Sequence, residues 1–360
     1  CWGSDYYGQL GDGGTRSNTN APSSTAIDLG TGRTAVAISA GGAYTCAILD
    51  NGDMKCWGND AKGQLGNGGT ITGLQLSPVA VSGSDTWDSS TGASSGSGSG
   101  SGSGSSSSSS FAYANNKLGA GFHTCAILDN GDLKCWGWDI HGQLGDGGST
   151  NTNIYAPSST AIDLGTGRTA VAVSAGYRHT CAILDNGDLK CWGRDFSGQL
   201  GDGGSNTETN APSSTTIDLG TGRTAVAVAA GYTHTCAILD NGDAKCWGRD
   251  IQGALGDGGQ LWTSSNPTDT NAPSSTAINL GTGRTAVAVA AGVGHTCAIL
   301  DNGDLKCWGR DNYGQLGDGG TNTNTNAPSS TAIDLGTGRT AVAVSAGDYH
   351  TCAILDNGDL

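Results

Sequence analysis

The chain has 360 residues and a formal net charge of −15, which argues against nucleic acid and anionic membrane surfaces as partners. No apolar run approaches the roughly 20 residues that a membrane-spanning helix needs, so we expect no membrane insertion. The chain starts inside a repeated motif and without a methionine, so we expect a mature or excised segment.

A unit of fixed plan recurs along the chain and is clearest at residues 166–220. It offers four strand-like runs, at 170–174, 180–184, 189–193 and 215–219, separated by Gly, Pro and Asp-Gly. Successive units start 55 to 79 residues apart by our count of their first cysteines, and none shows helical periodicity. Four strands in a repeat of this length predict a propeller blade.

The second and third runs of each unit form a thirteen-residue phrase, Cys-Ala-Ile-Leu-Asp-Asn-Gly-Asp-Leu-Lys-Cys-Trp-Gly at 181–193. The Asp-Asn-Gly segment predicts a β-hairpin. A two-residue turn would place Cys181 and Cys191 on opposite faces, whereas a three-residue turn with Gly187 in the left-handed region places them opposite each other. Paired cysteines therefore favour the three-residue turn, with a Cα separation of ~4.5 Å.

The twelve cysteines form six pairs with the same spacing, counting one pair across the two ends of the chain. An even number at hairpin spacing favours disulfides and an oxidising compartment, with buried thiols and metal ligands as weaker alternatives. The expected pairs are Cys1–Cys352, Cys46–Cys56, Cys125–Cys135, Cys181–Cys191, Cys236–Cys246 and Cys297–Cys307.

The sequence His-Thr-Cys-Ala-Ile-Leu-Asp-Asn-Gly-Asp-Leu-Lys-Cys-Trp-Gly-x-Asp-x-x-Gly-Gln-Leu-Gly, preceded by Val-Ala-Val-x-Ala-Gly, resembles the RCC1 (regulator of chromosome condensation) repeat. The resemblance covers nearly the whole chain and implies an all-β fold. The expected fold is a β-propeller whose blades each have four strands, usually with seven blades. Six units are present here, so we expect one propeller over residues 1–360 with six blades. Seven blades, or part of a longer array, are the alternatives.

The sixth copy of the phrase is split, because it begins at Cys352 and its Cys-Trp-Gly end is residues 1–3. We therefore expect one blade to be assembled from both termini, with Cys1–Cys352 locking the ring. A cut made at this point, with both cysteines pairing elsewhere, is the alternative. Residues 82–110, which are rich in Gly and Ser, are expected to form a flexible loop inserted in the propeller.

Residues repeated in every unit are interpreted as structural. The histidine of the unit, as at His179, is expected to bond a neighbouring loop rather than a metal, and the tryptophan to pack between blades with its N–H satisfied. The Gly-Asp-Gly-Gly aspartates are expected to shape turns, with calcium as a weak alternative and no other cofactor. These aspartates are Asp12, Asp146, Asp202, Asp257 and Asp318.

Residues that serve a specific function are expected at positions where a unit departs from the repeated sequence. Trp138, His141, Tyr155 and Trp262 stand at such places and are our candidate binding residues, with local packing as the alternative. No catalytic constellation is apparent, so an enzyme is not expected. The Pro, Ser and Thr of the repeated loops suit O-glycosylation, which would make the chain a glycoprotein.

These observations predict an extracellular or cell-surface propeller that acts as a structural or interaction module. Its partner would be a protein or a glycan, bound by loops on one face, or copies of itself in an extracellular assembly. The resemblance also allows exchange-factor activity toward a small GTPase, for which the acidic, cysteine-paired chain is poorly suited. A secreted enzyme inhibitor is a further alternative, supported only by a few aromatic loop residues.

Overall fold

The structure is a computed structural model, and it describes residues 6–14, 27–69, 73–89, 117–148, 153–204, 207–259, 269–319 and 323–357. The described residues form six antiparallel sheets in chain order. Ala and Val dominate the first strand of every sheet except the second, where it is Leu-Gly-Ala, and the cysteine phrase builds the next hairpin in the first five sheets. The fold is therefore all-β, as the sequence predicts.

The first three sheets comprise β1 to β10. The first sheet contains β1 (Ala35–Ala40), β2 (Tyr44–Leu49), β3 (Met54–Asn59) and β4 (Leu74–Ala80). The second contains β5 (Leu118–Ala120), β6 (His123–Ile127) and β7 (Leu133–Gly137). The third contains β8 (Ala170–Ala175), β9 (His179–Leu184) and β10 (Leu189–Gly193).

The remaining three sheets comprise β11 to β18. The fourth contains β11 (Ala225–Ala230), β12 (His234–Leu239) and β13 (Ala244–Gly248), followed by the one-turn 3-10 helix η1 (Ile251–Gly253). The fifth contains β14 (Ala286–Ala291), β15 (His295–Leu300) and β16 (Leu305–Gly309). The sixth contains β17 (Ala341–Ala346) and β18 (Thr351–Leu355). Within the described ranges, no helix is long and apolar enough to cross a membrane.

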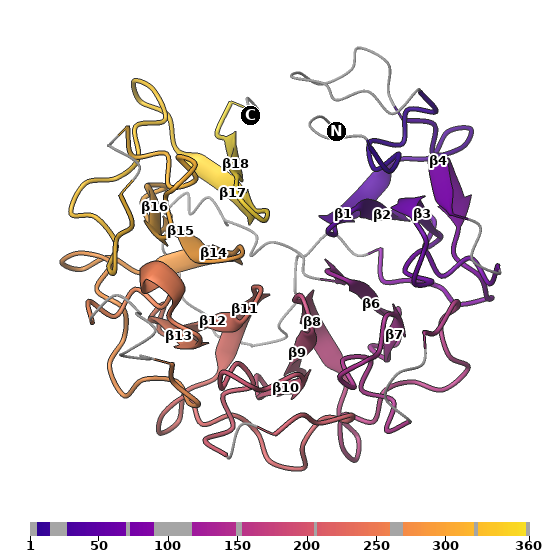
Figure 1. Cartoon of the computed structure of the whole chain (residues 1–360), viewed down its shortest axis with the longest axis horizontal. Coiled ribbons are helices and arrows are strands. Elements are labelled where there is room, and N and C mark those ends of the chain that lie inside the picture. Colours follow the sequence, from indigo (N-terminus) through magenta and orange to yellow (C-terminus); the bar gives the residue numbers. More distant parts are fainter. Residues whose placement is uncertain are drawn as a thin grey trace, which may run out of the picture.

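The sheets follow one another around a common centre, and the first strand of each lies nearest to it (Figure 1). The described sheets form an arc in which β17 and β18, at the yellow end, and β1, at the indigo end, flank the same opening (Figure 1). This arrangement is that of a β-propeller, with each sheet as a blade. It places the loops at one end of all the strands on one face of the molecule.

The predicted turn register is confirmed in the hairpin of β9 and β10. The Leu184 N–H donates to the carbonyl of Asp188 at 2.8 Å, and the Gly187 N–H donates to the carbonyl of Leu184 at 2.8 Å. Gly187 has φ +82°, which a residue with a Cβ adopts at a cost. Three residues therefore form the turn, and Cys181 lies directly opposite Cys191 with their Cα atoms 4.1 Å apart.

Five of the predicted disulfides are present. They join Cys46–Cys56, Cys125–Cys135, Cys181–Cys191, Cys236–Cys246 and Cys297–Cys307. Cys352 is half-buried on β18 and forms no disulfide within the described part of the chain. Its expected partner, Cys1, lies outside the described residues, so the sixth disulfide stays a prediction.

The predicted fourth strand is wrong in the unit from which it was read. Residues 215–219 form no strand. They are linked to β10 by a hydrogen bond from the Ile217 N–H to the carbonyl of Leu189 at 3.0 Å. Two local bonds compete for this backbone, because the Ser213 hydroxyl accepts the Thr215 N–H and the Asp218 carboxylate accepts the Gly220 N–H. The apolar side chains at 217 and 219 are nevertheless buried.

In the first sheet an outer strand does form, as β4 (Leu74–Ala80). The following residues, 82–89, belong to the predicted Gly/Ser insertion and pack against the second sheet. Trp87 is buried there, and the Asp85 carboxylate lies 2.8 Å from the Nζ of Lys134. Residues 90–110 of the predicted insertion lie outside the described part of the chain.

In the first to fifth sheets, a tryptophan fills the seam between the sheet and the loop that precedes it around the ring. Trp192 is fully buried, and its indole N–H donates to the carbonyl of Gln143 at 3.0 Å. Gly145 lies so close to this ring that a Cβ there would clash. The expected packing role is therefore confirmed, and it recurs at Trp57, Trp136, Trp247 and Trp308.

The repeated histidine also links neighbouring sheets, although through a different partner from the one expected. The imidazole of His179 bonds the hydroxyl of Thr235 in the fourth sheet at 2.9 Å, rather than a loop backbone. The same contact joins His123 to Thr180, His234 to Thr296 and His295 to Thr351. The histidine ring is a connector between blades.

Candidate functional site

Two sets of loops meet at one end of the strands. The loop from β8 to β9 carries Tyr177 and Arg178, and the chain leaves β10 at Arg194. Because the strands are antiparallel, the end of the first, the start of the second and the end of the third lie together. The variable residues of these loops therefore gather on one face of the propeller.

Aromatic rings from three consecutive sheets contact one another on this face. The ring of Tyr177 stacks on that of Tyr232, with centroids 4.0 Å apart, and Phe122 meets Tyr177 edge-on at 4.2 Å. Trp138 lies 5.6 Å from Phe122 and 6.2 Å from Tyr177. All four side chains are half-buried, so the cluster is ordered by its own contacts and still reaches solvent.

Arg178 lies over this cluster. Its guanidinium carbon is 5.0 Å from the centre of the Trp138 ring and 4.8 Å from that of Tyr177. Its Nη1 lies 3.1 Å from Nε2 of His141, whose Nδ1 lies 2.6 Å from a carboxylate oxygen of Glu208. Burial lowers the pKa of His141, with Glu208 acting in the opposite direction and Arg178 in the same one. Arg178 therefore bonds a neutral ring that accepts its N–H.

A second guanidinium lies close to the first. Arg194 covers the ring of Phe196, which is 58% exposed, with 4.7 Å between the guanidinium carbon and the ring centre. Burial lowers the pKa of Arg194 and the positive charge of Arg178 lowers it further, while the carboxylate of Glu208 acts in the opposite direction. The result is a pair of neighbouring positive charges on aromatic rings, in a chain of net charge −15.

We call this set of residues the aromatic–arginine surface. It comprises Phe122, Trp138, His141, Tyr177, Arg178, Arg194, Phe196 and Tyr232. A smaller version occurs between the fifth and sixth sheets, where Arg310 lies 5.0 Å from the ring centre of Tyr349 and 5.5 Å from that of Tyr313.

The structure divides the predicted binding residues. Trp138 and His141 belong to the aromatic–arginine surface, where both contact Arg178. Tyr155 packs closely on Gly63 of the preceding loop, and its carbonyl accepts the Gly68 N–H at 2.9 Å, which is the local-packing alternative. Trp262 lies outside the described residues.

The sequence did not single out Tyr177, Arg178 or Arg194. Tyr177 recurs as Tyr232 and Arg194 recurs as Arg249 and Arg310, so neither stands out as a break in the repeat, while Arg178 lies at a position that varies from unit to unit. The available signal was compositional, because the residues after Ala-Gly are variable and often aromatic, as at Phe122 and Tyr232. That signal becomes a site only when the fold brings three loops together.

The aspartates of the Gly-Asp-Gly-Gly motif show turn contacts. The Asp146 carboxylate accepts the Gly148 N–H at 2.8 Å, and the same bond occurs at Asp12, Asp202 and Asp257. The aspartate that follows Trp-Gly-x caps the same loop, because the Asp139 carboxylate accepts the Leu144 N–H at 3.0 Å. In the described ranges, no three His, Cys, Asp or Glu side chains converge on one point.

Comparison with known proteins places these blades in a family. Two models of the regulator of chromosome condensation (RCC1) repeat match the chain, one at residues 1–48, 130–183, 186–238 and 302–354. The other matches residues 35–64, 170–199, 225–253 and 286–315. Together they cover the third, fourth and fifth sheets, nearly all of the sixth, the first sheet without β4, and only β7 of the second sheet.

Whole proteins that resemble the chain share about a quarter of its residues over the aligned region. The chain is 27% identical to the ultraviolet-B receptor UVR8 of Arabidopsis thaliana, over 88% of this chain and 62% of the receptor. It is 25% identical to the human E3 ubiquitin-protein ligase HERC2, over 70% of this chain and 5% of the ligase. The chain thus matches less than two thirds of the length of either relative.

Solved structures show the same fold at low identity. Yeast RCC1 (Prp20), bound to Kap60, aligns with a TM-score of 0.70 at 20% identity, covering 98% of this chain and 74% of that one. Human WBSCR16 aligns with a TM-score of 0.62 at 18% identity, covering 98% of both chains. The repeat matches and the sheet topology agree: the chain belongs to the RCC1 repeat family and is a β-propeller of antiparallel blades.

Proposed function

We propose that this propeller is a protein-interaction module that binds an acidic segment of a partner protein through the aromatic–arginine surface. The observation that carries the proposal is the pairing of Arg178 with Arg194 on aromatic rings, at the face where the loops of three sheets meet. A carboxylate placed between the two guanidinium groups would relieve their mutual repulsion. It would also form charge-assisted hydrogen bonds, which are about twice as strong as neutral ones.

The surrounding groups support an acidic ligand. Arg178 bonds the neutral ring of His141, so its positive charge is not paired directly with a carboxylate in that contact. The half-buried rings of Trp138 and Tyr177 offer apolar contact beside these charges, and Trp, Tyr and Arg are enriched among the residues that dominate binding energies.

Two further observations support the finer parts of the proposal. Yeast RCC1 (Prp20) is solved with Kap60 bound, so a protein that contains this fold takes a protein partner. Five disulfides, all at hairpin spacing, favour an oxidising compartment, and we place the protein outside the cell or at its surface. A glycan ligand and self-assembly are alternative outcomes of the test below.

The test is a random peptide library displayed on phage and selected on the immobilised 360-residue chain. We expect enrichment of peptides that carry Asp or Glu beside an apolar residue, and loss of their binding in the Arg178→Ala/Arg194→Ala double variant. Arg223→Ala is the matched control, because Arg223 pairs with Asp240 at 3.3 Å at the opposite end of the strands. Enrichment without acidic residues, or binding to a glycan array alone, would contradict the proposal.

A further inference from the structure

Three residues that depart from the repeat meet at the aromatic–arginine surface. His141 is the one histidine of the chain outside the repeat position, and Glu208 is the only glutamate of the chain. Arg178 is the only arginine at its position in the repeat. His141 follows β7 of the second sheet, whereas the other two belong to loops of the third sheet, so the packing of two blades brings the three side chains together.

The two neighbours of the His141 ring determine which nitrogen carries its proton. Nδ1 lies 2.6 Å from a carboxylate oxygen of Glu208, and an ionised carboxylate only accepts hydrogen bonds. Nε2 lies 3.1 Å from Nη1 of Arg178, and a guanidinium only donates. The neutral ring therefore carries its proton on Nδ1 and offers Nε2 as the acceptor that holds Arg178.

A second proton on this ring would change its contact with Arg178. The proton must go to Nε2, where it would face the N–H of the guanidinium, and two donors do not form a hydrogen bond. The charged ring would stay paired with Glu208, while the positive charges of Arg178 and Arg194 oppose its protonation. Burial lowers the pKa of His141, so the ring is neutral near pH 7 and takes up a proton below its ordinary value of about 6.5.

We propose that His141 is a proton switch within the aromatic–arginine surface, which takes up a proton when it binds an acidic segment; this inference rests on the proposed function. A ligand carboxylate between Arg178 and Arg194 neutralises the two charges that oppose the protonation of His141. The N–H of Arg178 that His141 releases becomes a donor to the ligand. Both effects strengthen binding as the pH falls, and the bound ligand must in turn favour the protonated ring.

Two buried carboxyls titrate in the same pH range as His141. Asp139 lies on the loop of His141 and Asp195 on the loop of Arg194, and burial raises the pKa of each to about 6. Each carboxylate accepts a backbone N–H of its own loop. Arg178 and Arg194 remain charged throughout this range. The contribution of His141 is therefore the difference between the wild-type chain and His141→Gln.

The first experiment needs no ligand. It follows the 360-residue chain, labelled with ¹⁵N-histidine and ¹⁵N-arginine, by NMR, and His141→Gln and Arg178→Ala identify the two sets of signals. At about pH 7.5 we expect the proton of His141 on Nδ1. As the pH falls, the signals of the His141 ring and of the Arg178 guanidinium should move together, with one midpoint below about 6.5. A proton on Nε2 at about pH 7.5, or an Arg178 signal that does not follow His141, would overturn the switch.

The second experiment measures the proton linkage. The probe is a rhodamine-labelled peptide of alternating cysteic acid and Leu, whose sulfonates keep their charge between about pH 7.5 and pH 5.5. We expect its Kd to be at least about fivefold lower at the acid end, within the usual range of coupling between two sites. His141→Gln should lose this dependence, and Glu208→Gln, which removes the partner of the charged ring, should move it to lower pH. The control His350→Gln, at an exposed histidine of the sixth sheet, should keep it.

The outcomes separate the switch from the proposed function. Binding with the same Kd at both pH values, or an equal pH dependence in His141→Gln, would overturn the proton linkage and leave the proposed function standing. No binding of the probe at either pH would contradict the proposed function, and the NMR titration would then decide the switch without a ligand. Far-UV circular dichroism at both pH values shows that each variant is folded during the measurement.

Discussion

Nε2 of His179 lies 2.9 Å from the hydroxyl oxygen of Thr235, across the seam between the third and fourth sheets. The Thr235 hydroxyl donates its own hydrogen to the carbonyl of Gln199 at 2.8 Å. It must therefore accept from the imidazole, so Nε2 of His179 carries a proton. Burial lowers the pKa of His179 to about 3, so the ring is neutral and this proton is its only one on nitrogen near pH 7.

This arrangement predicts that stability falls in mild acid. The pKa values of His123, His179 and His234 are each lowered to about 3, and that of His295 to about 4. Below about pH 6.5 the unfolded chain binds protons that the folded chain does not, so each histidine lowers the free energy of unfolding by about 1.4 kcal/mol per pH unit. Urea unfolding at several pH values between about 7 and 4.5 measures this slope.

Two buried carboxyls act in the opposite direction. Burial raises the pKa of Asp139 and of Asp195 to about 6, so between about pH 4 and pH 6 the folded chain binds protons more tightly than the unfolded chain does at these two sites. Burial raises the pKa values of Asp60, Asp269, Asp311 and Asp348 as well, so the histidine contribution is measured as the difference in slope between the wild-type chain and a histidine variant. His179→Gln, which keeps an N–H donor and does not titrate, should reduce the slope by about 1.4 kcal/mol per pH unit. An unchanged slope would contradict the neutral-histidine assignment.

Thr235→Val should destabilise the seam. The substitution leaves the buried N–H of His179 without its acceptor, which costs about 1–3 kcal/mol. The carbonyl of Gln199 keeps a donor in the Trp247 indole at 3.1 Å, so its contribution is smaller. Thr216→Val, on an exposed loop, should change stability by less than about 0.5 kcal/mol. Equal unfolding midpoints for the two variants would contradict a structural role for the histidine–threonine contact.

The hairpin disulfides should each contribute to stability. Replacing Cys181 and Cys191 together by serine removes a cross-link between residues ten apart and should lower the free energy of unfolding by about 2–3 kcal/mol. Titration of thiols in denaturant gives the direct count. The prediction is that the wild-type chain shows no free thiol, whereas twelve free thiols would refute both the disulfides and the proposed extracellular location.

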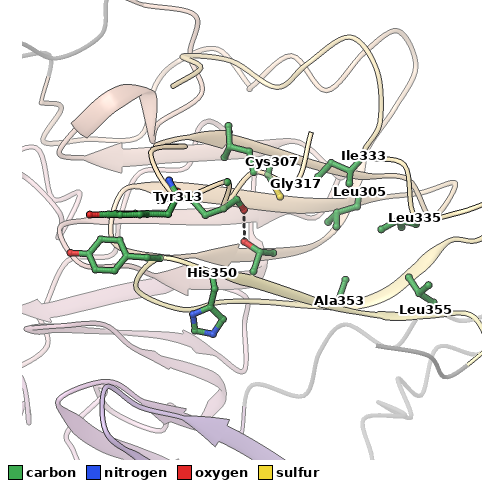
Figure 2. Close-up of a pocket in the computed structure, with 14 residues that line it drawn as sticks. Leu305, Cys307, Tyr313, Gly317, Ile333, Leu335, His350, Ala353 and Leu355 are labelled. Carbon is green, nitrogen blue, oxygen red and sulfur yellow. Dashed lines mark hydrogen bonds between the residues drawn. The ribbon is translucent and has the colours of Figure 1, made fainter. Parts of the chain in front are cut away.

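The predicted Cys1–Cys352 disulfide can be tested by peptide mapping without reduction. Cys352 is half-buried on β18, and its neighbours Thr351 and Ala353 line a pocket between the fifth and sixth sheets (Figure 2). Because this bond closes a very long loop, Cys1→Ser should cost at least about 4 kcal/mol and lower the melting temperature of the whole propeller. Unchanged thermal stability in that variant would argue against locked closure.

Local rules predicted the hairpin and failed for the outer strand. In the hairpin, the Asp-Asn-Gly turn and the parity of Cys181 and Cys191 allow one register, so the sequence determines it. At 215–219, Ile217 and Leu219 give the sequence the alternating apolar pattern of a strand, and in the structure both side chains are buried. They are buried by packing, while Ser213 and Asp218 divert the neighbouring backbone N–H groups. An alternating apolar pattern indicates that side chains are buried, but it does not show whether the backbone pairs with a neighbouring strand.

The candidate surface was predictable in part. Trp138 and His141 depart from the repeat, and that departure marked them correctly as residues to follow. Arg178 and Arg194 lie on two different loops, and the proximity of their charges depends on how the hairpins end. The histidine partner was missed for the same reason, because Thr235 belongs to the next unit and only the packing of blades brings it to His179.

The central claim, that the aromatic–arginine surface binds an acidic protein segment, is tested most directly by the Kd of a selected acidic peptide. The account predicts that Arg178→Ala/Arg194→Ala raises this Kd at least tenfold, since each lost charge-assisted hydrogen bond costs about 1.5–3 kcal/mol. Arg223→Ala should leave it unchanged. Equal Kd values for the wild-type chain and the double variant would contradict the claim.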